Sequence, residues 1–216
     1  AKPDGYPTGE QIVTQLKESR RAKWNAILPA DASGLDAFRE MARPALITAM
    51  GLSLPTKGEV GVRDLRKEDR GGYTLIRARI GANARKESLP IMIYVPASKA
   101  IKGTVVIAHG QGKAALADIE AGGPGPLVKA LLADGRAVLA FDAFLIGEHN
   151  APGKRTDRLK KAFPDTFLPT DTAYRVQDTL TAIAFARGSE YARGPVDVIG
   201  IGEGGVWSIL AAGVDA

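Results

Sequence analysis

Residues 200–205 read Gly-Ile-Gly-Glu-Gly-Gly and lie between an apolar run, residues 196–199, and a helix-like stretch, residues 206–212. One class of enzymes with a nucleophilic serine places it on a sharp strand-to-helix turn with the pattern G-x-S-x-G. Gly202 occupies the serine position of that pattern, the nucleophile-elbow position, and has no side chain that could attack a substrate. The segment therefore predicts the framework of a nucleophile turn without the nucleophile.

The same glycines allow a second interpretation. Gly200, Gly202 and Gly205 fit the pattern G-x-G-x-x-G, in which glycines let a pyrophosphate approach the backbone at a helix N-terminus. That pattern normally opens its domain, and an acidic residue is expected about 20 positions later. Here the turn follows two earlier strand–helix units, and the sequence stops at Ala216 before such a position. Dinucleotide binding is therefore kept as the lesser alternative.

The elements around the turn alternate between strands and helices. Short apolar runs predict strands, and capped or periodic segments between them predict helices. The predicted strands are residues 73–80, 89–95, 103–108, 137–141 and 196–199, and the predicted helices are residues 126–134 and 171–187. From residue 103 onward this order predicts an α/β fold, with a mostly parallel sheet and flanking helices.

An N-terminal helical extension, residues 1–58, precedes this domain, which we place at residues 59–216. Thr8 and Gln11 form a capping-box pattern at the start of a first helix. Ser33 is the expected cap of a second helix, which Pro44 either kinks or divides.

Composition excludes several classes of function. The chain is 45% hydrophobic and 25% charged, with a net charge of +5 and no cysteine. Its basic clusters are mixed with acidic residues and lack interleaved aromatics, so we expect no nucleic-acid partner. No apolar run approaches the ~20 residues that span a bilayer, so we expect no membrane partner. Two distant histidines without cysteine predict no metal site, and we expect no cofactor.

Several segments together carry a family resemblance. Residues 89–96 read as a strand closed by proline, and residues 105–112 read Val-Val-Ile-Ala-His-Gly-Gln-Gly. Residues 135–142 form a further strand that ends in aspartate, and Gly147-Glu148 follow it. With the glycine turn, residues 75–216 resemble the α/β-hydrolase superfamily, and within it esterases like the acetyl xylan esterases and dienelactone hydrolases.

The resemblance implies a site. The backbone N–H groups of Glu203 and Gly204, with the loop at Gly110 and Gln111, would form an oxyanion hole that binds an ester or carbohydrate ligand. His109 and Asp142 would fix the loops around it. The resemblance also favours an extracellular or periplasmic location.

The sequence departs from the family at its chemistry. A serine triad takes its acid and its histidine from segments after the nucleophile turn. The histidines of this chain, His109 and His149, both precede that turn, and His149 is expected on an exposed loop. Two hypotheses follow: a catalytically degenerate esterase-type domain, or part of an active carbohydrate or small-ester hydrolase whose catalytic residues lie on sequence or a chain not given.

The last predicted strand, residues 196–199, has no following strand in the sequence. An unpaired strand edge favours association. We therefore expect a partner chain or a further C-terminal segment to complete the sheet.

Overall fold

The computed structural model describes residues 5–56, 58–97, 100–118, 120–150 and 168–215. The chain divides into two compact units, Ala1–Leu46 and Ile47–Ala216. The division expected between residues 58 and 59 remains a prediction. Among the described helices, none has both the length and the apolar character that a membrane crossing requires.

Helix α1 (Gly9–Ile27) begins at the expected capping box. The Thr8 side chain accepts a hydrogen bond from the Gln11 N–H, and the Gln11 side chain accepts one from the Thr8 N–H. No residue of α1 is buried, and Trp24 contacts Phe38 of the next helix edge-on, with ring centroids 6.4 Å apart.

Helix α2 (Leu35–Met50) contains Pro44 and continues through it as one helix. The expected cap at Ser33 is wrong. A short 3₁₀ turn precedes α2, and the carboxylate of Asp31 accepts hydrogen bonds from the N–H groups of Ser33 and Gly34. An aspartate two residues upstream satisfies the free N–H groups that the serine was expected to satisfy.

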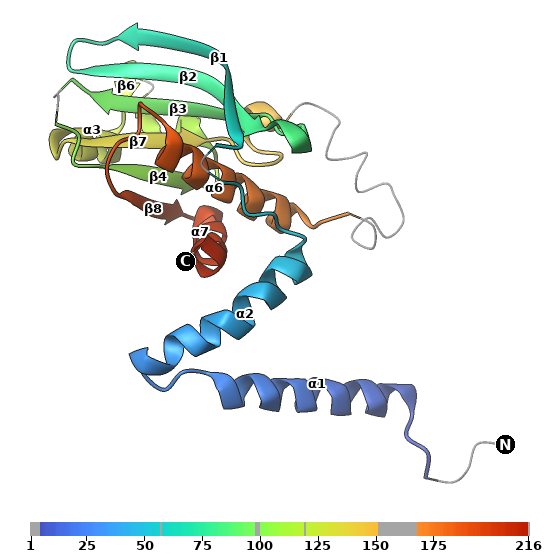
Figure 1. The fold of residues 1–216 in the computed structure, drawn as a ribbon. Helices are drawn as coiled ribbons and strands as arrows, with labels where there is room; N and C mark the ends of the chain where they lie inside the picture. Colours follow the sequence, from blue (N-terminus) through green and yellow to red (C-terminus); the bar gives the residue numbers. More distant parts are fainter. Residues whose placement is uncertain (1–4, 57, 98–99, 119, 151–167, 216) are drawn as a thin grey trace. The chain divides into compact units, whose positions relative to one another are not determined.

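The second unit is built on a six-stranded sheet with the order β1-β2-β3-β7-β4-β8 (Figure 1). Its strands are β1 (Val60–Asp69), β2 (Tyr73–Ala82), β3 (Leu89–Pro96), β4 (Gly103–His109), β7 (Arg136–Phe141) and β8 (Val196–Ile201). The expected α/β class is confirmed, and the sheet is mixed. β4 lies between β7 and β8 and runs parallel to both, whereas β1, β2, β3 and β7 pair in antiparallel succession.

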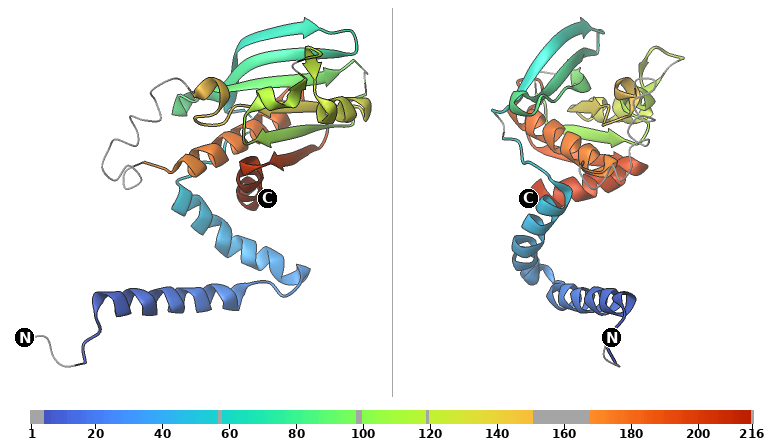
Figure 2. Two further views of the ribbon diagram at one scale, coloured as in Figure 1. Left: turned by 180° about the vertical axis from the view of Figure 1, so that it is seen from behind. Right: turned by 90° about the vertical axis from the view of Figure 1, so that its right-hand side faces the viewer.

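Helices cover both faces of the sheet (Figure 2). Helix α3 (Pro126–Ala133) packs against β3 and β7 on one face, and α6 (Asp171–Gly188) and α7 (Glu203–Asp215) lie on the other. A two-stranded ribbon of β5 (Ala117–Asp118) and β6 (Gly123–Pro124) lies beside α3.

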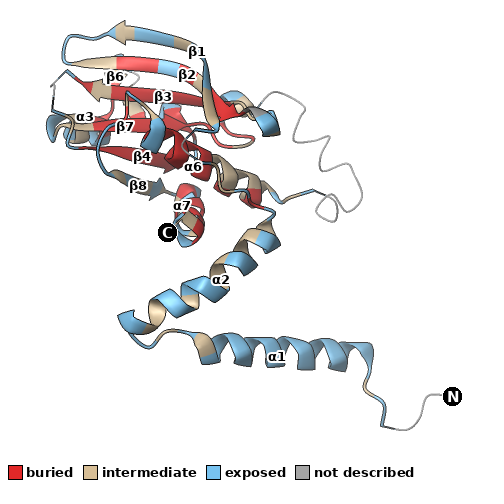
Figure 3. Ribbon diagram, in the orientation of Figure 1, coloured by how far each residue is buried: buried red, intermediate tan, exposed pale blue. Residues whose placement is uncertain are grey.

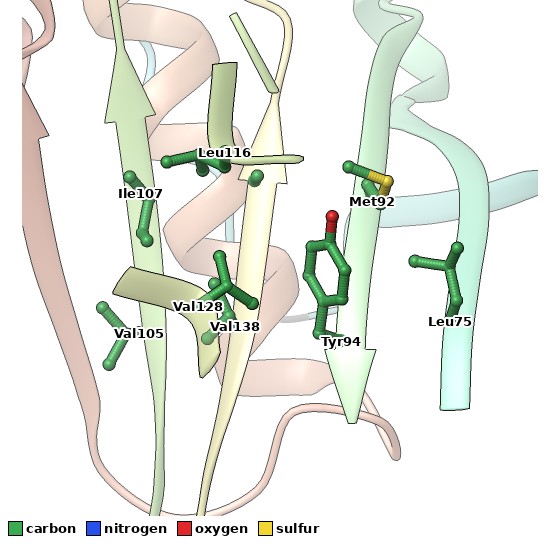
Figure 4. Packing of buried hydrophobic residues seen from close by; sticks show 9 residues of the cluster. Leu75, Met92, Tyr94, Val105, Ile107, Leu116, Val128 and Val138 are labelled. Carbon is green, nitrogen blue, oxygen red and sulfur yellow. The ribbon is translucent and has the colours of Figure 1, made fainter. Parts of the chain in front are cut away.

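The core lies along the central strands. Apolar side chains of α3 and of β2, β3, β4 and β7 form one cluster (Figure 4), which includes Leu75, Met92, Tyr94, Val105, Ile107, Val128 and Val138. Figure 3 shows β3, β4 and β7 almost wholly buried and the edge strands β1 and β8 partly exposed. The glycine turn and its neighbouring loops follow the C-terminal ends of β4, β7 and β8, next to this core.

Candidate functional site

Gly202 forms the apex of a sharp turn between β8 and α7. Its φ is +61°, in the left-handed region that favours glycine, and a Cβ added there would meet no atom within 4 Å. A nucleophilic serine at such a turn occupies a strained conformation with its side chain exposed. The turn thus combines a left-handed backbone conformation at Gly202 with open space where a side chain would stand.

The flanking glycines have a packing role. A Cβ on Gly200 would lie 2.4 Å from the Cα of Gly205, and a Cβ on Gly204 would lie 2.0 Å from the carbonyl oxygen of Ala108. Only glycine allows α7 to approach β8 and β4 this closely. The spacing that suggested dinucleotide binding is therefore explained by helix–strand contact.

The N-terminus of α7 lies beside the loop that follows β4. Glu203 and Gly204 are its first two residues, so their N–H groups have no acceptor within the helix. A Cβ on Gly110 would lie 3.2 Å from the Glu203 nitrogen, which shows how closely the β4 loop approaches this helix end. The positive end of the helix dipole adds to the attraction for an anion.

The N–H groups of the β4 loop bond within the protein. Gly110 donates its N–H to the carbonyl of Ile201 at 3.0 Å, and Gln111 donates to Nδ1 of His109 at 3.0 Å. His109 thus holds the loop, and the Gly110 bond fastens the loop to the end of β8. At the end of α7, Glu203 lines the pocket beside this loop, whereas Gly204 is buried.

A pocket of about 350 Å³ opens beside the turn, and we call it the turn pocket. It is lined by Gly110, Gln111, Leu145, Ile146, Gly147, Asn150, Arg175 and Glu203. The structure therefore brings together three of the four expected oxyanion-hole residues, while Gly204 is buried against β4. The lining residues described here include no serine, threonine, cysteine, lysine or histidine, and their one carboxylate is that of Glu203, which pairs with Arg175.

Asp142 ties two loops together behind the pocket. Its buried carboxylate accepts hydrogen bonds from the N–H groups of Lys113 at 2.8 Å and Glu148 at 3.0 Å, and it pairs with the Lys113 ammonium. Gly112 and Gly147 pack so tightly on this carboxylate that an added Cβ would lie within 2.5 Å of it. Asp142 thus joins the loop after β4 to the loop after β7.

Arg175, which the sequence analysis did not identify, connects the turn to the β7 loop. Its Nη1 lies 3.1 Å from Oε2 of Glu203, and its Nε donates to the carbonyl of Phe144 at 3.2 Å. The guanidinium also lies over the Trp207 ring, 5.2 Å from its centroid. This arginine therefore places a positive charge beside the first residue of α7.

Asp178, one turn further along α6, was also not identified. It accepts the N–H of Phe144 at 2.7 Å. Burial raises the pKa of Asp178 to about 8; the nearby charge of Glu87 adds to this rise, while the Phe144 N–H and Arg175 oppose it. Both residues lie on α6. Thr170 caps this helix, because its side chain accepts the Ala173 N–H.

The two histidines lie outside the pocket lining. His149 was expected to be exposed, and this expectation is wrong: it is partly buried, with Nε2 2.6 Å from the carbonyl oxygen of Ser88. It fastens the β7 loop to the start of β3. Among the described residues, no cluster of three or more histidines, cysteines or carboxylates could hold a metal ion.

Three solved structures with a similar arrangement of strands and helices are described as esterases. A protein assigned as an acetyl xylan esterase from Bacteroides fragilis has a TM-score of 0.64 at 15% identity over 100% of this chain and 60% of its own. A methylesterase gives 0.60 at 17% identity over 90% of this chain and 42% of its own. A glucuronoyl esterase from Solibacter usitatus gives 0.54 at 17% identity over 84% and 56%.

No protein-family model and no curated protein matches this sequence. The chain spans 60% or less of the length of these three structures. At identities of 15–17% the likeness concerns the fold. The second unit has the α/β-hydrolase fold of these esterases, as the resemblance implied, and the dinucleotide interpretation is not favoured.

Proposed function

We propose that this chain is an esterase-like domain that binds an acyl-bearing ligand in the turn pocket without hydrolysing it. The observation that carries the proposal is Gly202 at the apex of the turn, where φ is +61° and the space for a side chain is open. A serine triad needs a nucleophile at this point. Without a nucleophile, the turn and the start of α7 can still bind the oxygen atoms of a ligand.

Two features support binding of a carboxylate or an ester carbonyl. Glu203, which lines the turn pocket, is the first residue of α7, so its N–H lies at the positive end of the helix without an acceptor in the helix. Arg175 lines the same pocket and pairs with the Glu203 carboxylate, which reduces the repulsion that this side chain would exert on an anion. The Glu203 side chain is 72% exposed, so it can move aside when a ligand enters.

The absence of hydrolysis is tested with aryl acetates on the natural chain, Gly202→Ser and Gly202→Ala. Both substitutions place a Cβ at the same backbone conformation, so they differ only by the hydroxyl group. We expect no turnover by the natural chain above the level of Gly202→Ala. We also expect Gly202→Ser to fold and remain inactive, because neither histidine lies in the pocket lining.

Two results would contradict this part of the proposal. One is turnover by the natural chain together with a covalent adduct of a serine-directed phosphonate, located by mass spectrometry. The other is robust hydrolysis by Gly202→Ser alone, which would show that the chain supplies a base to the turn.

Binding is tested with acetate by thermal unfolding and by calorimetry. We expect acetate to stabilise the natural chain, and we expect Arg175→Gln to weaken acetate binding by about fivefold, as loss of a charge-assisted hydrogen bond implies. Arg187→Gln is the matched control, because Arg187 lies on the same helix and pairs with Asp215. Equal effects of the two substitutions would show that acetate responds to overall charge.

A further inference from the structure

Strands β1 and β2 place four arginines on one face of the sheet. The antiparallel register sets Arg63 opposite Arg79 and Arg66 opposite Arg77. Residues directly opposite each other in a sheet share a face, and like charges in such pairs are destabilising. The face therefore concentrates positive charge, and the repulsion between the arginines lowers the free energy of unfolding.

A β-bulge produces this arrangement. Residues three apart in a regular strand point to opposite faces, so Arg63 and Arg66 would normally be separated. The register shifts by one residue between them, and Asp64 within the bulge has a φ of +55°. The extra residue returns Arg66 to the face that Arg63 occupies.

Two carboxylates of the protein itself form ion pairs with the cations of this face. Glu148 lies between two cations, with one oxygen 2.6 Å from Nζ of Lys113 and the other 3.2 Å from Nη2 of Arg79. Glu68 likewise bridges Arg77 and a second arginine. On this face, a carboxylate thus pairs with two cations in two separate places.

Arg66 is the exception. Within the described residues it makes no hydrogen bond and no ion pair, although it lies directly opposite Arg77 and is exposed. It lines a groove of about 430 Å³, which we call the arginine groove. The charged residues of its lining are Arg66, Arg77, Arg79 and Lys113 on the positive side and Asp64 and Glu148 on the negative side.

We propose that the arginine groove binds a carboxylate group of a ligand, with Arg66 as its principal contact. A guanidinium offers two parallel N–H donors that match the two oxygens of a carboxylate. A bound carboxylate would also offset the repulsion between Arg66 and Arg77, as Glu148 does for Arg79 and Lys113. The proposal is independent of chemistry at Gly202.

The groove neighbours the turn pocket along two shared loops. Gln111 and Gly147 line the turn pocket, and Lys113 and Glu148, one or two residues further, line the arginine groove. A ligand whose acyl group occupies the turn pocket can therefore place an acidic group in the groove.

The test measures citrate binding by isothermal titration calorimetry at low, fixed ionic strength, because salt screens exposed charges. We expect the natural chain to bind citrate, Arg66→Gln to weaken binding by about fivefold, and Arg66→Lys to weaken it by about threefold through loss of the paired donors. Lys67→Gln is the matched control. It removes the same charge from the next residue, whose ammonium lies over the Tyr191 ring.

A second measurement separates binding from folding. Without ligand, Arg66→Gln should unfold at the same temperature as the natural chain or higher, because it removes the Arg66–Arg77 repulsion. With citrate, its unfolding temperature should rise less than that of the natural chain.

Three outcomes would overturn the proposal. Absence of saturable citrate binding is one, and an equal loss of binding in Lys67→Gln is another, since it would indicate attraction by overall charge. Inorganic sulfate that binds more tightly than citrate and depends equally on Arg66 would assign the groove to a tetrahedral oxyanion.

Discussion

Asp178 and Arg175 hold the two backbone polar groups of one residue of the β7 loop: Asp178 accepts the N–H of Phe144 at 2.7 Å, and Arg175 donates to the Phe144 carbonyl at 3.2 Å. The next residue, Leu145, lines the turn pocket with a φ of +59°, an uncommon conformation for a side chain of this kind. One turn of α6 therefore maintains the shape of the pocket wall.

The titration of Asp178 makes stability depend on pH. Because its pKa is about 8 in the folded state and 3.8 ordinarily, the folded protein keeps a proton that the unfolded chain releases. The free energy of unfolding therefore falls as the pH rises from about 4 to about 8, by up to about 1.4 kcal/mol per pH unit from this group. Asp178→Asn should remove this contribution, as urea denaturation at about pH 5 and about pH 8 can measure.

Glu40→Gln is the control for Asp178→Asn, because Glu40 is an exposed carboxylate of α2. It should leave the pH profile unchanged. An identical profile for the natural chain and Asp178→Asn would show that the carboxylate titrates normally.

The glycines of the turn should differ sharply in their tolerance of a side chain. Gly204→Ala would bring a Cβ to 2.0 Å from the Ala108 carbonyl, and we expect a loss of about 3 kcal/mol or more, or failure to fold. Gly202→Ala meets only the conformational cost of a positive φ, about 1 kcal/mol. Urea denaturation of both variants tests the distinction, and equal losses would contradict it.

The buried pair of Asp142 and Lys113 should be strongly coupled. Asp142→Asn leaves the ammonium without its main partner, and we expect a loss of about 3–5 kcal/mol. The double variant Asp142→Asn/Lys113→Met should lose less than the sum of the two single variants. Asp134→Asn, at an exposed pair with Lys102, should change stability little, and a loss equal to that of Asp142→Asn would indicate no special role for the buried pair.

The edge strand β8 and the adjoining surface of α7 should promote association. Among the described strands β8 lies at the edge of the sheet, and Val206 and Ile209 of α7 are exposed, Ile209 by 73%. We expect concentration-dependent association in sedimentation velocity and its reduction by Ile209→Glu. Val13→Glu, at an exposed apolar residue of α1, is the control and should leave association unchanged. A natural chain that stays monomeric at all concentrations would contradict the expectation.

Local patterns were sufficient to predict most of the second unit. The apolar runs of β4 and β7 are buried on both faces, and the length of α6 follows from its cap and its terminal glycine. Strand β1 escaped prediction for a physical reason. It is an edge strand rich in charge, and its bulge breaks the alternation that identifies a strand.

Sequence patterns indicate the parts of the candidate site that are local in sequence and give no sign of the parts that packing brings together. Gly202, Glu203 and Gly204 belong to one short segment, so their spacing alone indicated the turn. Arg175 meets Glu203 only through the packing of α6 beside α7, and periodicity along α6 identifies its buried apolar face rather than its polar contacts. The pairing of Lys113 with Asp142 likewise depends on β4 lying beside β7.

Because of the bulge in β1, the face of the sheet on which Arg66 lies depends on the number of residues between Arg63 and Arg66. Deletion of Leu65 would leave every charged side chain in the sequence and still turn one of Arg63 and Arg66 toward the opposite face, on which α6 packs. A single-codon insertion or deletion could therefore create or abolish the charged face without any substitution. Sequences related to this one should thus be compared by the length of this segment as well as by its residues.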